Sequence, residues 1–150
     1  MQLPRSHIEF IERAECVRLL ATQEVGRVAF ATAGGGADIF PVNYVLDGDA
    51  IVFATAAGSK LSSADRGTIS FEVDSTDAAT RSGWSVVIHG FSQEITNCDS
   101  PQVVERLRSL PLNPWAGGDR PHLVRISPRT ITGRRIGHPP AIECGTTSFS

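Results

Sequence analysis

A chain of 150 residues with 41% apolar and 20% charged residues can bury one core, so its composition excludes a disordered chain and favours a single domain. The formal net charge of -2 gives no general attraction to polyanions, so we expect no nucleic-acid partner. No apolar run approaches the ~18 residues of a membrane span, and Met1 to Arg5 lead into charged sequence. We therefore expect no membrane partner and a cytoplasmic location.

The first predicted element is a short amphipathic helix over residues 13–22, where Val17, Leu20 and Ala21 recur at helical spacing. Upstream of it, Ser6 and Glu9 match a capping box, which would start the helix earlier. The same stretch can also run extended, and both interpretations stay open.

Alternating apolar residues and turn signals then predict a meander of strands. Asp47-Gly48-Asp49 separates two β-rich runs and is a strong hairpin signal. Gly90 is expected at a bend or bulge of a long strand. The strands are expected at 26–31, 38–46, 50–55, 68–74 and 84–95, with one or two more at 123–126 and 131–136, a polar loop over 75–83 and a second helix over 101–110.

Sequential strands with helices only at the periphery suit a closed antiparallel barrel, because no βαβ repeat is present. We predict a mainly β fold, a barrel with peripheral helices over residues 1–136. Two prolines and small polar residues predict a flexible tail over residues 137–150.

The cysteines and histidines are too scattered to predict a metal site. Cys16, Cys98 and Cys144 lack the close spacing of a zinc knuckle or a redox dithiol. The histidines form neither an HExxH motif nor a His-x-His pair. We expect three reduced thiols and no metal.

The stretch 55–61 has the features of an anion-binding turn. It contains a glycine that lets backbone approach a ligand, Ser59 that can cap the turn, and Lys60, which is the only lysine in the chain. Arg66 or Arg27 can supply a second partner for the same phosphate. The stretch is not a Walker loop, and the alternative is an ordinary capped turn with an exposed lysine.

Pro41, Val42, Asn43 and Tyr44 lie within the second predicted strand. Proline inside a strand belongs at an edge or an irregularity, where backbone groups can meet a ligand, and the Asn43 amide offers both a donor and an acceptor. These residues can therefore read a flat heterocycle. The alternative is a structural bulge with Tyr44 packed in the core.

Trp84 and Trp115 stand near predicted loops, where an indole can stack on a planar ring. Arg120 and Arg125 follow the second tryptophan and can pair with a phosphate or a carboxylate. The alternative is that each tryptophan closes one end of the barrel.

Read in order, these segments resemble a known family. They are the helix 13–22, Val25-Gly26-Arg27-Val28-Ala29-Phe30, Pro41-Val42-Asn43-Tyr44, Thr55-Ala56-Ala57-Gly58-Ser59-Lys60, Phe71-Glu72-Val73-Asp74, Gly83-Trp84-Ser85-Val86-Val87-Ile88-His89-Gly90 and Ile131-Thr132-Gly133-Arg134-Arg135-Ile136. Over residues 12–136 the chain resembles the pyridoxamine 5′-phosphate oxidase-like family. The resemblance implies a six-stranded antiparallel split barrel of the FMN-binding type.

The resemblance also implies a homodimer with FMN in two equivalent clefts at the interface. The isoalloxazine would be lined by Pro41, Val42, Asn43 and Tyr44, and the ribityl chain and phosphate would be held by Thr55, Ser59 and Lys60. The ring pocket would be closed by Trp84, Ser85 and Val86. The partner's site would be reached by Trp115 with Arg120 or Arg125.

The function implied by the resemblance is an FMN-dependent oxidoreductase that transfers a hydride between flavin N5 and a small planar substrate. This chemistry belongs to the cofactor and needs no general base, so we predict no catalytic residue. Two alternatives stay open: a non-catalytic module that binds or senses a flavin, and a reductase of the same fold that uses deazaflavin F420.

Overall fold

The computed structural model describes residues 7–56, 67–95, 100–112 and 122–137. Predictions that fall on Ser59, Lys60, Trp115, Arg120 and the tail 138–150 lie outside these residues. The elements in chain order are β1 (His7–Ile11), α1 (Arg13–Leu20), β2 (Val25–Ala31), β3 (Ala37–Asp47), β4 (Ala50–Thr55), β5 (Thr68–Asp77), β6 (Ser82–Ile95), α2 (Pro101–Arg108) and β7 (His122–Gly137).

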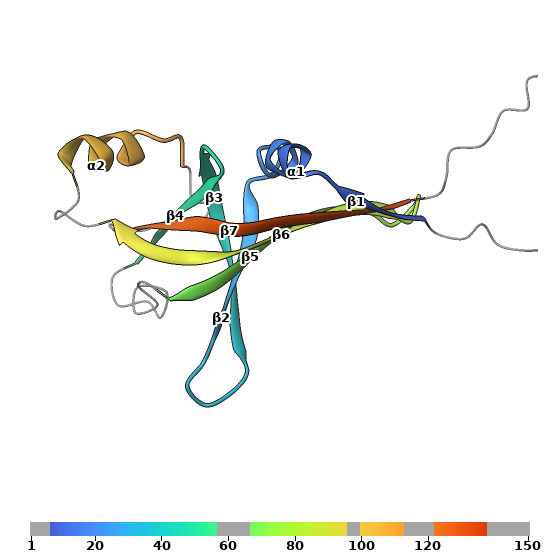
Figure 1. Ribbon diagram of the computed structural model, residues 1–150, viewed down its shortest axis with the longest axis horizontal. Helices are drawn as coiled ribbons and strands as arrows, with labels where there is room; N and C mark the ends of the chain where they lie inside the picture. Colours follow the sequence, from blue (N-terminus) through green and yellow to red (C-terminus); the bar gives the residue numbers. More distant parts are fainter. Residues whose placement is uncertain (1–6, 57–66, 96–99, 113–121, 138–150) are drawn as a thin grey trace, which may run out of the picture.

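Six antiparallel strands close into a barrel, as the sequence predicts. They follow the order β7-β4-β3-β2-β5-β6, and β6 pairs back with β7 to complete the ring. In the view of Figure 1, both helices lie on one side of the long β6–β7 pair, and the β2–β3 hairpin projects from the other side. The fold is therefore mainly β with helices at the periphery.

One edge of β7 is shared between two strands. β4 pairs with residues 122–126 of β7, whereas β1 pairs with residues 133–137. The other edge of β7 pairs with β6 along almost its whole length. The N-terminal strand and β4 therefore follow one another along the same edge.

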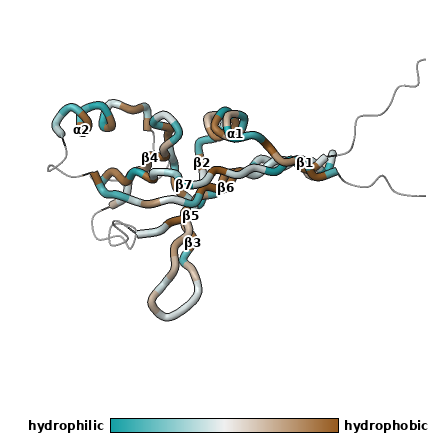
Figure 2. The backbone as a smooth tube through the Cα atoms, in the orientation of Figure 1, coloured by the Kyte–Doolittle hydropathy of each residue, from teal (hydrophilic) through white to brown (hydrophobic). Residues whose placement is uncertain are grey.

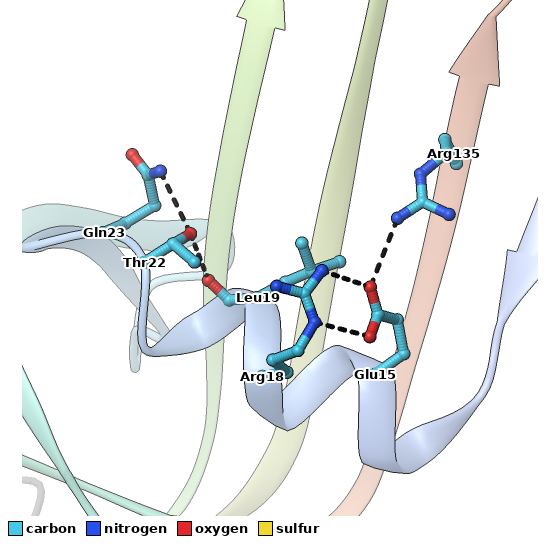
Figure 3. A network of polar contacts seen from close by, with 6 residues as sticks. All are labelled: Glu15, Arg18, Leu19, Thr22, Gln23 and Arg135. Atoms are coloured by element: carbon cyan, nitrogen blue, oxygen red, sulfur yellow. Dashed lines mark hydrogen bonds and ion pairs between the residues drawn. The ribbon is translucent and has the colours of Figure 1, made fainter.

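Helix α1 packs closely against β7 because Gly133 has no side chain. A Cβ at Gly133 would lie 2.6 Å from the Sγ of Cys16, which is fully buried in α1. Glu15 adds a polar tie on the surface: it accepts a 2.7 Å hydrogen bond from Arg18 Nε, and its Oε1 lies 3.5 Å from Arg135 Nη2 of β7 (Figure 3). The hydrogen bond from Arg18 lowers the pKa of the Glu15 carboxyl.

The core has two parts. The larger cluster fills the barrel around Phe53 and Phe71, both fully buried, and α1 contributes Leu20 to it. The smaller cluster joins Leu107 of α2 to residues of β4 and β6. Figure 2 shows hydrophobic and hydrophilic segments mixed along the barrel strands. Burial alternates from residue to residue along β5, as expected when one face of a strand is buried.

The structure differs from the predicted elements mainly at strand ends. Residues 7–11, left open between helix and strand, form β1 because β7 offers them a pairing edge. The predicted loop 75–83 is wrong at both ends, because Ser75 pairs with Trp84 and Thr76 with Gly83 as cross-strand neighbours. Helices α1 and α2 are each two residues shorter than predicted, and the last strand is a single long one.

Two predicted irregularities are confirmed. The β6–β7 register shifts between His89 and Gly90. Pro41 pairs with Arg27 of β2, while the pairing of β3 with β4 begins only at Tyr44. Within the described residues, Pro41 therefore lies on a free edge of β3, where its missing N–H removes no ladder bond. No described helix has the length and hydropathy required to cross a membrane.

Candidate functional site

The residues of β3 predicted to line a ring are divided between the surface and the core. Pro41 is exposed, and Val42 is partly buried against the main cluster. Tyr44 is only 4% exposed: its ring meets Phe71 edge-on at 5.1 Å, and its hydroxyl donates to the Leu20 carbonyl. Burial raises the pKa of the Tyr44 phenol. The Tyr44 ring is therefore part of the core and is not available to a ligand.

Asn43 and Tyr44 line a pocket of about 290 Å³ between β3 and the end of α1. The Asn43 Nδ2 donates to the Glu24 carbonyl at 3.4 Å, and the Tyr44 N–H donates to the same carbonyl at 3.1 Å. Leu20, Leu46 and other residues complete the wall. The structure thus brings two of the four predicted ring-lining residues of β3 to one cavity.

Trp84 and Ser85 line a different pocket, of about 350 Å³, at the outer end of the β5–β6 hairpin. Trp84 also packs against the main core. Val86, the third member of this predicted group, is fully buried and pairs with Val73 of β5 and Gly133 of β7, so it lines neither pocket. Within one copy, the pocket lined by Asn43 and Tyr44 shares no residue with the pocket lined by Trp84 and Ser85.

Thr55 ends β4 directly before the predicted anion-binding turn. It is 3% exposed, and its Oγ1 is buried without a hydrogen-bond partner in the part of the chain that the structure describes. A buried hydroxyl without a partner costs roughly 1–3 kcal/mol, so one that persists in a fold is a candidate for binding a ligand. The other residues of the predicted phosphate group, Ser59 and Lys60, lie outside the described residues.

Arg125 is held by a network that fastens α2 to the barrel. Its Nε donates to Asp47 Oδ2 at 3.3 Å, and its Nη1 donates to Ser127 Oγ at 2.9 Å. Arg106 of α2 binds the other oxygen of the same Asp47 carboxylate. The role of Arg125 toward a second copy remains a prediction, and within one copy this guanidinium has a structural partner.

A partly buried pair of an acid and a histidine next to Thr55 escaped the sequence analysis. Thr55 pairs with His122 across β4 and β7, and the His122 Nδ1 is hydrogen-bonded to Glu94 of β6. Ser92 lies nearby on β6, where its N–H donates to the Gly67 carbonyl at 3.0 Å. No local pattern signals this pair, because its two members lie on different strands.

Arg27 lies on the outer face of the barrel beside two acidic residues of β5. Its Nη1 is 3.5 Å from Glu72 Oε2, and its Nη2 is 3.5 Å from Asp74 Oδ1. Desolvation and the neighbouring Asp74 carboxylate raise the pKa of Glu72 to about 7, although Arg27 opposes the shift. The sequence suggested Arg27 as a phosphate partner, and the structure gives it these two carboxylates.

The raised pKa of Glu72 predicts a pH-dependent stability. The folded protein holds this proton more tightly than the unfolded chain, where the pKa is near its ordinary 4.5. The resulting stabilisation is complete below that value and is lost as the pH rises through about 7. We expect Glu72→Gln to flatten this fall in the free energy of unfolding, measured by urea denaturation at several pH values. Glu105→Gln, at an exposed site on α2, is the matched control; if Glu72→Gln leaves the fall as steep as in wild type, the assignment is wrong.

The chain is similar to known proteins over most of its length. Residues 12–135 match the family described as pyridoxamine 5′-phosphate oxidase. Among curated proteins, the chain is 37% identical over 141 residues to the uncharacterized protein Rv0080 of Mycobacterium tuberculosis, which covers 89% of this chain and 90% of that protein.

Two solved structures share the architecture. The FAD binding protein from Mycobacterium smegmatis has a TM-score of 0.76 and 31% identity, over 87% of this chain and 100% of that one. The FAD-binding protein from Mesorhizobium loti has a TM-score of 0.67 and 21% identity, over 89% and 100% of the two chains, and at that identity it shows the fold alone. The family match and the relative in Mycobacterium tuberculosis together show that this chain belongs to the pyridoxamine 5′-phosphate oxidase family.

Proposed function

We propose that this protein binds FMN and acts as an oxidoreductase that transfers a hydride between the flavin and a small planar substrate. The observation that carries the proposal is the Thr55 hydroxyl, buried and without a partner among the described residues, at the end of the strand that leads to Ser59 and Lys60. A relative of known structure at 31% identity is an FAD binding protein, which supports a flavin as the ligand.

The chain's own residues fit a flavin in three ways. Thr55, Ser59 and Lys60 supply two hydroxyls and one cation, the groups expected around a terminal phosphate dianion. The free edge of β3 at Pro41 leaves backbone available to the ring system. Ser85 and Trp84 line a pocket with an apolar wall, which would exclude water from the ring. When bound, the flavin would supply hydride transfer, and these residues would bind and orient it.

The cofactor that the purified protein releases distinguishes FMN from FAD and F420. Lys60 is the only lysine, and a phosphate monoester makes fuller use of a cation and two hydroxyls than one phosphate of a diphosphate does. We expect a yellow protein whose released cofactor has the mass of FMN. Release of FAD or F420 would replace FMN in the proposal, and a colourless protein that does not quench added FMN fluorescence would remove the flavin altogether.

We further propose a homodimer with each flavin site at the interface. Two observations support it: four of the predicted ring-lining residues are divided between two separate pockets within one copy, and several large apolar side chains are exposed. Phe10 is 79% exposed and Ile39 64%. A second copy would cover such residues and bring β3 of one protomer to β6 of the other. Sedimentation should show a dimer, and a monomer with full FMN affinity would contradict the shared site.

Stopped-flow reduction separates an enzyme from a passive flavin carrier. An oxidoreductase should show flavin bleaching with NADH, NADPH or reduced F420 at a rate that saturates with donor concentration. A flavin that binds tightly but is reduced by none of these donors would favour the alternative of a module that binds or senses the cofactor.

A further inference from the structure

The inner face of the barrel is polar at the end where β4, β6 and β7 lie together. Thr55 of β4 and His122 of β7 are cross-strand partners, so their side chains share a face. Glu94 of β6 is paired with Val124 of β7 in the same way, and Val124 belongs to the main core. Because side chains alternate along a strand, His122 and Val124 lie on the same face of β7. Thr55, Glu94 and His122 are therefore gathered on the inner face.

Glu94 fixes the orientation of the His122 ring. The Nδ1 atom of His122 is hydrogen-bonded to Glu94 Oε1, and both side chains are partly buried, 33% exposed for His122 and 18% for Glu94. A carboxylate bound at one ring nitrogen keeps a proton on that nitrogen, so the other nitrogen, Nε2, points elsewhere. Within the described residues Nε2 has no hydrogen-bond partner. The pair therefore presents one ring nitrogen to a ligand.

Thr55 supplies a second group without a partner on this face. Its side chain is 3% exposed, and its Oγ1 has no hydrogen bond among the residues that the structure describes. Buried hydroxyls are nearly always hydrogen-bonded, and this one lies opposite a ring nitrogen that also lacks a partner. A single ligand that accepts hydrogen bonds from both residues would satisfy the two together.

We infer that Thr55 and His122 bind one phosphate monoester between them, and that this binding takes up a proton on His122. The Thr55 hydroxyl donates to one phosphate oxygen. The His122 ring keeps its proton at Nδ1 for Glu94, gains a second proton from solvent at Nε2, and donates it to another phosphate oxygen. That this phosphate is the one carried by the flavin rests on the proposed function.

The charges around His122 explain why the proton is needed. Among the described strands, Glu94 of β6 is the titratable group that faces the ring, since Thr55 of β4 and Val124 of β7 carry no charge. Beside a neutral imidazole, the Glu94 carboxylate would repel a phosphate dianion. An imidazolium between the two anions turns this repulsion into attraction. Glu94 is therefore a positioning residue, which acts on the phosphate only through His122.

FMN and riboflavin differ only in the phosphate, so their affinities for the full chain isolate this contact. Between about pH 7 and 9 the phosphate is a dianion throughout, because its second pKa is about 6. We expect the FMN affinity to fall as the pH rises across this range, by up to about tenfold per pH unit for one coupled proton. The riboflavin affinity should stay constant. Fluorescence quenching measures both affinities on protein freed of flavin by dialysis.

Variants assign the proton to His122. His122→Gln keeps a hydrogen-bonding side chain that takes up no proton, so its FMN affinity should be about tenfold lower than that of wild type near pH 7 and should no longer vary with pH. Glu94→Gln keeps the ring but removes the carboxylate that stabilises the imidazolium, so the fall in affinity should begin at a lower pH. An unchanged riboflavin affinity shows that each variant is folded.

His7→Gln is the matched control. His7 is exposed on β1 and pairs with Gly137, at the opposite end of β7 from His122. It should bind both flavins like wild type at every pH.

The ring nitrogens of His122 give a second readout, which requires no flavin. Their nitrogen-15 chemical shifts should show a protonated Nε2 when FMN or inorganic phosphate is added, and no change when riboflavin is added. The signals are assigned by their loss in His122→Gln.

The outcomes separate this inference from the proposed function. Wild-type protein that binds FMN with an affinity independent of pH, or with a pH dependence that persists in His122→Gln, would overturn the inference alone. Protein that binds no FMN, but whose His122 is protonated when inorganic phosphate is added, would refute the proposed function alone. Protein that responds to neither FMN nor inorganic phosphate would refute both.

Discussion

Replacing Lys60 and Ser59 together by alanine is expected to lower the affinity for FMN by about 100-fold or more, because each lost charge-assisted hydrogen bond to the phosphate is worth roughly 1.5–3 kcal/mol. Affinity for riboflavin, which has no phosphate, should stay at the wild-type level. Fluorescence quenching of the two flavins measures both values on the same sample. Arg129→Ala, which removes a charge from the surface of β7, controls for a general change in electrostatics.

Thr55→Val tests the proposed phosphate site with a smaller change. It replaces the hydroxyl by a methyl group of similar size. Because this hydroxyl has no partner among the described residues, the flavin-free protein should lose no stability, and its FMN affinity can be compared directly with that of wild type. FMN affinity should fall about tenfold. Unchanged FMN binding in both Thr55→Val and the Lys60/Ser59 variant would place the phosphate elsewhere in the protein.

Gly90→Ala is expected to destabilise the fold by about 3 kcal/mol, at the upper end of the cost of overpacking. A Cβ at Gly90 would lie 2.1 Å from the backbone oxygen of Ser127 and 3.0 Å from the Pro128 Cα. Both contacts are with backbone at the register shift between β6 and β7, so no flexible side chain can move aside. Urea denaturation of the purified variant measures the loss.

Gly34→Ala is the matched control, because a Cβ at Gly34 meets nothing within 4 Å in the β2–β3 turn. Its free energy of unfolding should stay within about 0.5 kcal/mol of wild type. If Gly90→Ala is equally mild, the close approach of β6 and β7 at the bulge is wrong.

The barrel could be predicted because each strand carries its own signal. Alternation along 68–74, the Asp47-Gly48-Asp49 turn and the glycine inside the long strand each depend on neighbouring residues only, and all three hold in the structure. The ends of strands could not be predicted in the same way. Ser75 and Thr76 extend β5 because Trp84 and Gly83 lie opposite, which is a property of the pair and not of either segment.

The candidate site shows the same division. Thr55 could be singled out from a local motif, and its burial agrees with a role in binding. The pairing of Glu94 with His122 joins residues from two strands far apart in the sequence, so no local pattern reveals it.

The shared edge of β7 has a consequence for how the chain reaches this fold. During synthesis, β1, β4 and β6 all emerge from the ribosome before β7. Each of these strands has an edge that pairs with β7 in the folded protein, and β1 is the first of them to be made. Unpaired strand edges can pair with strands of other chains. A chain that ends before residue 122 would therefore expose strand edges that favour aggregation, together with part of the hydrophobic core. Closure of the barrel therefore depends on β7, and we expect truncation of this strand to yield aggregates and not a smaller folded protein.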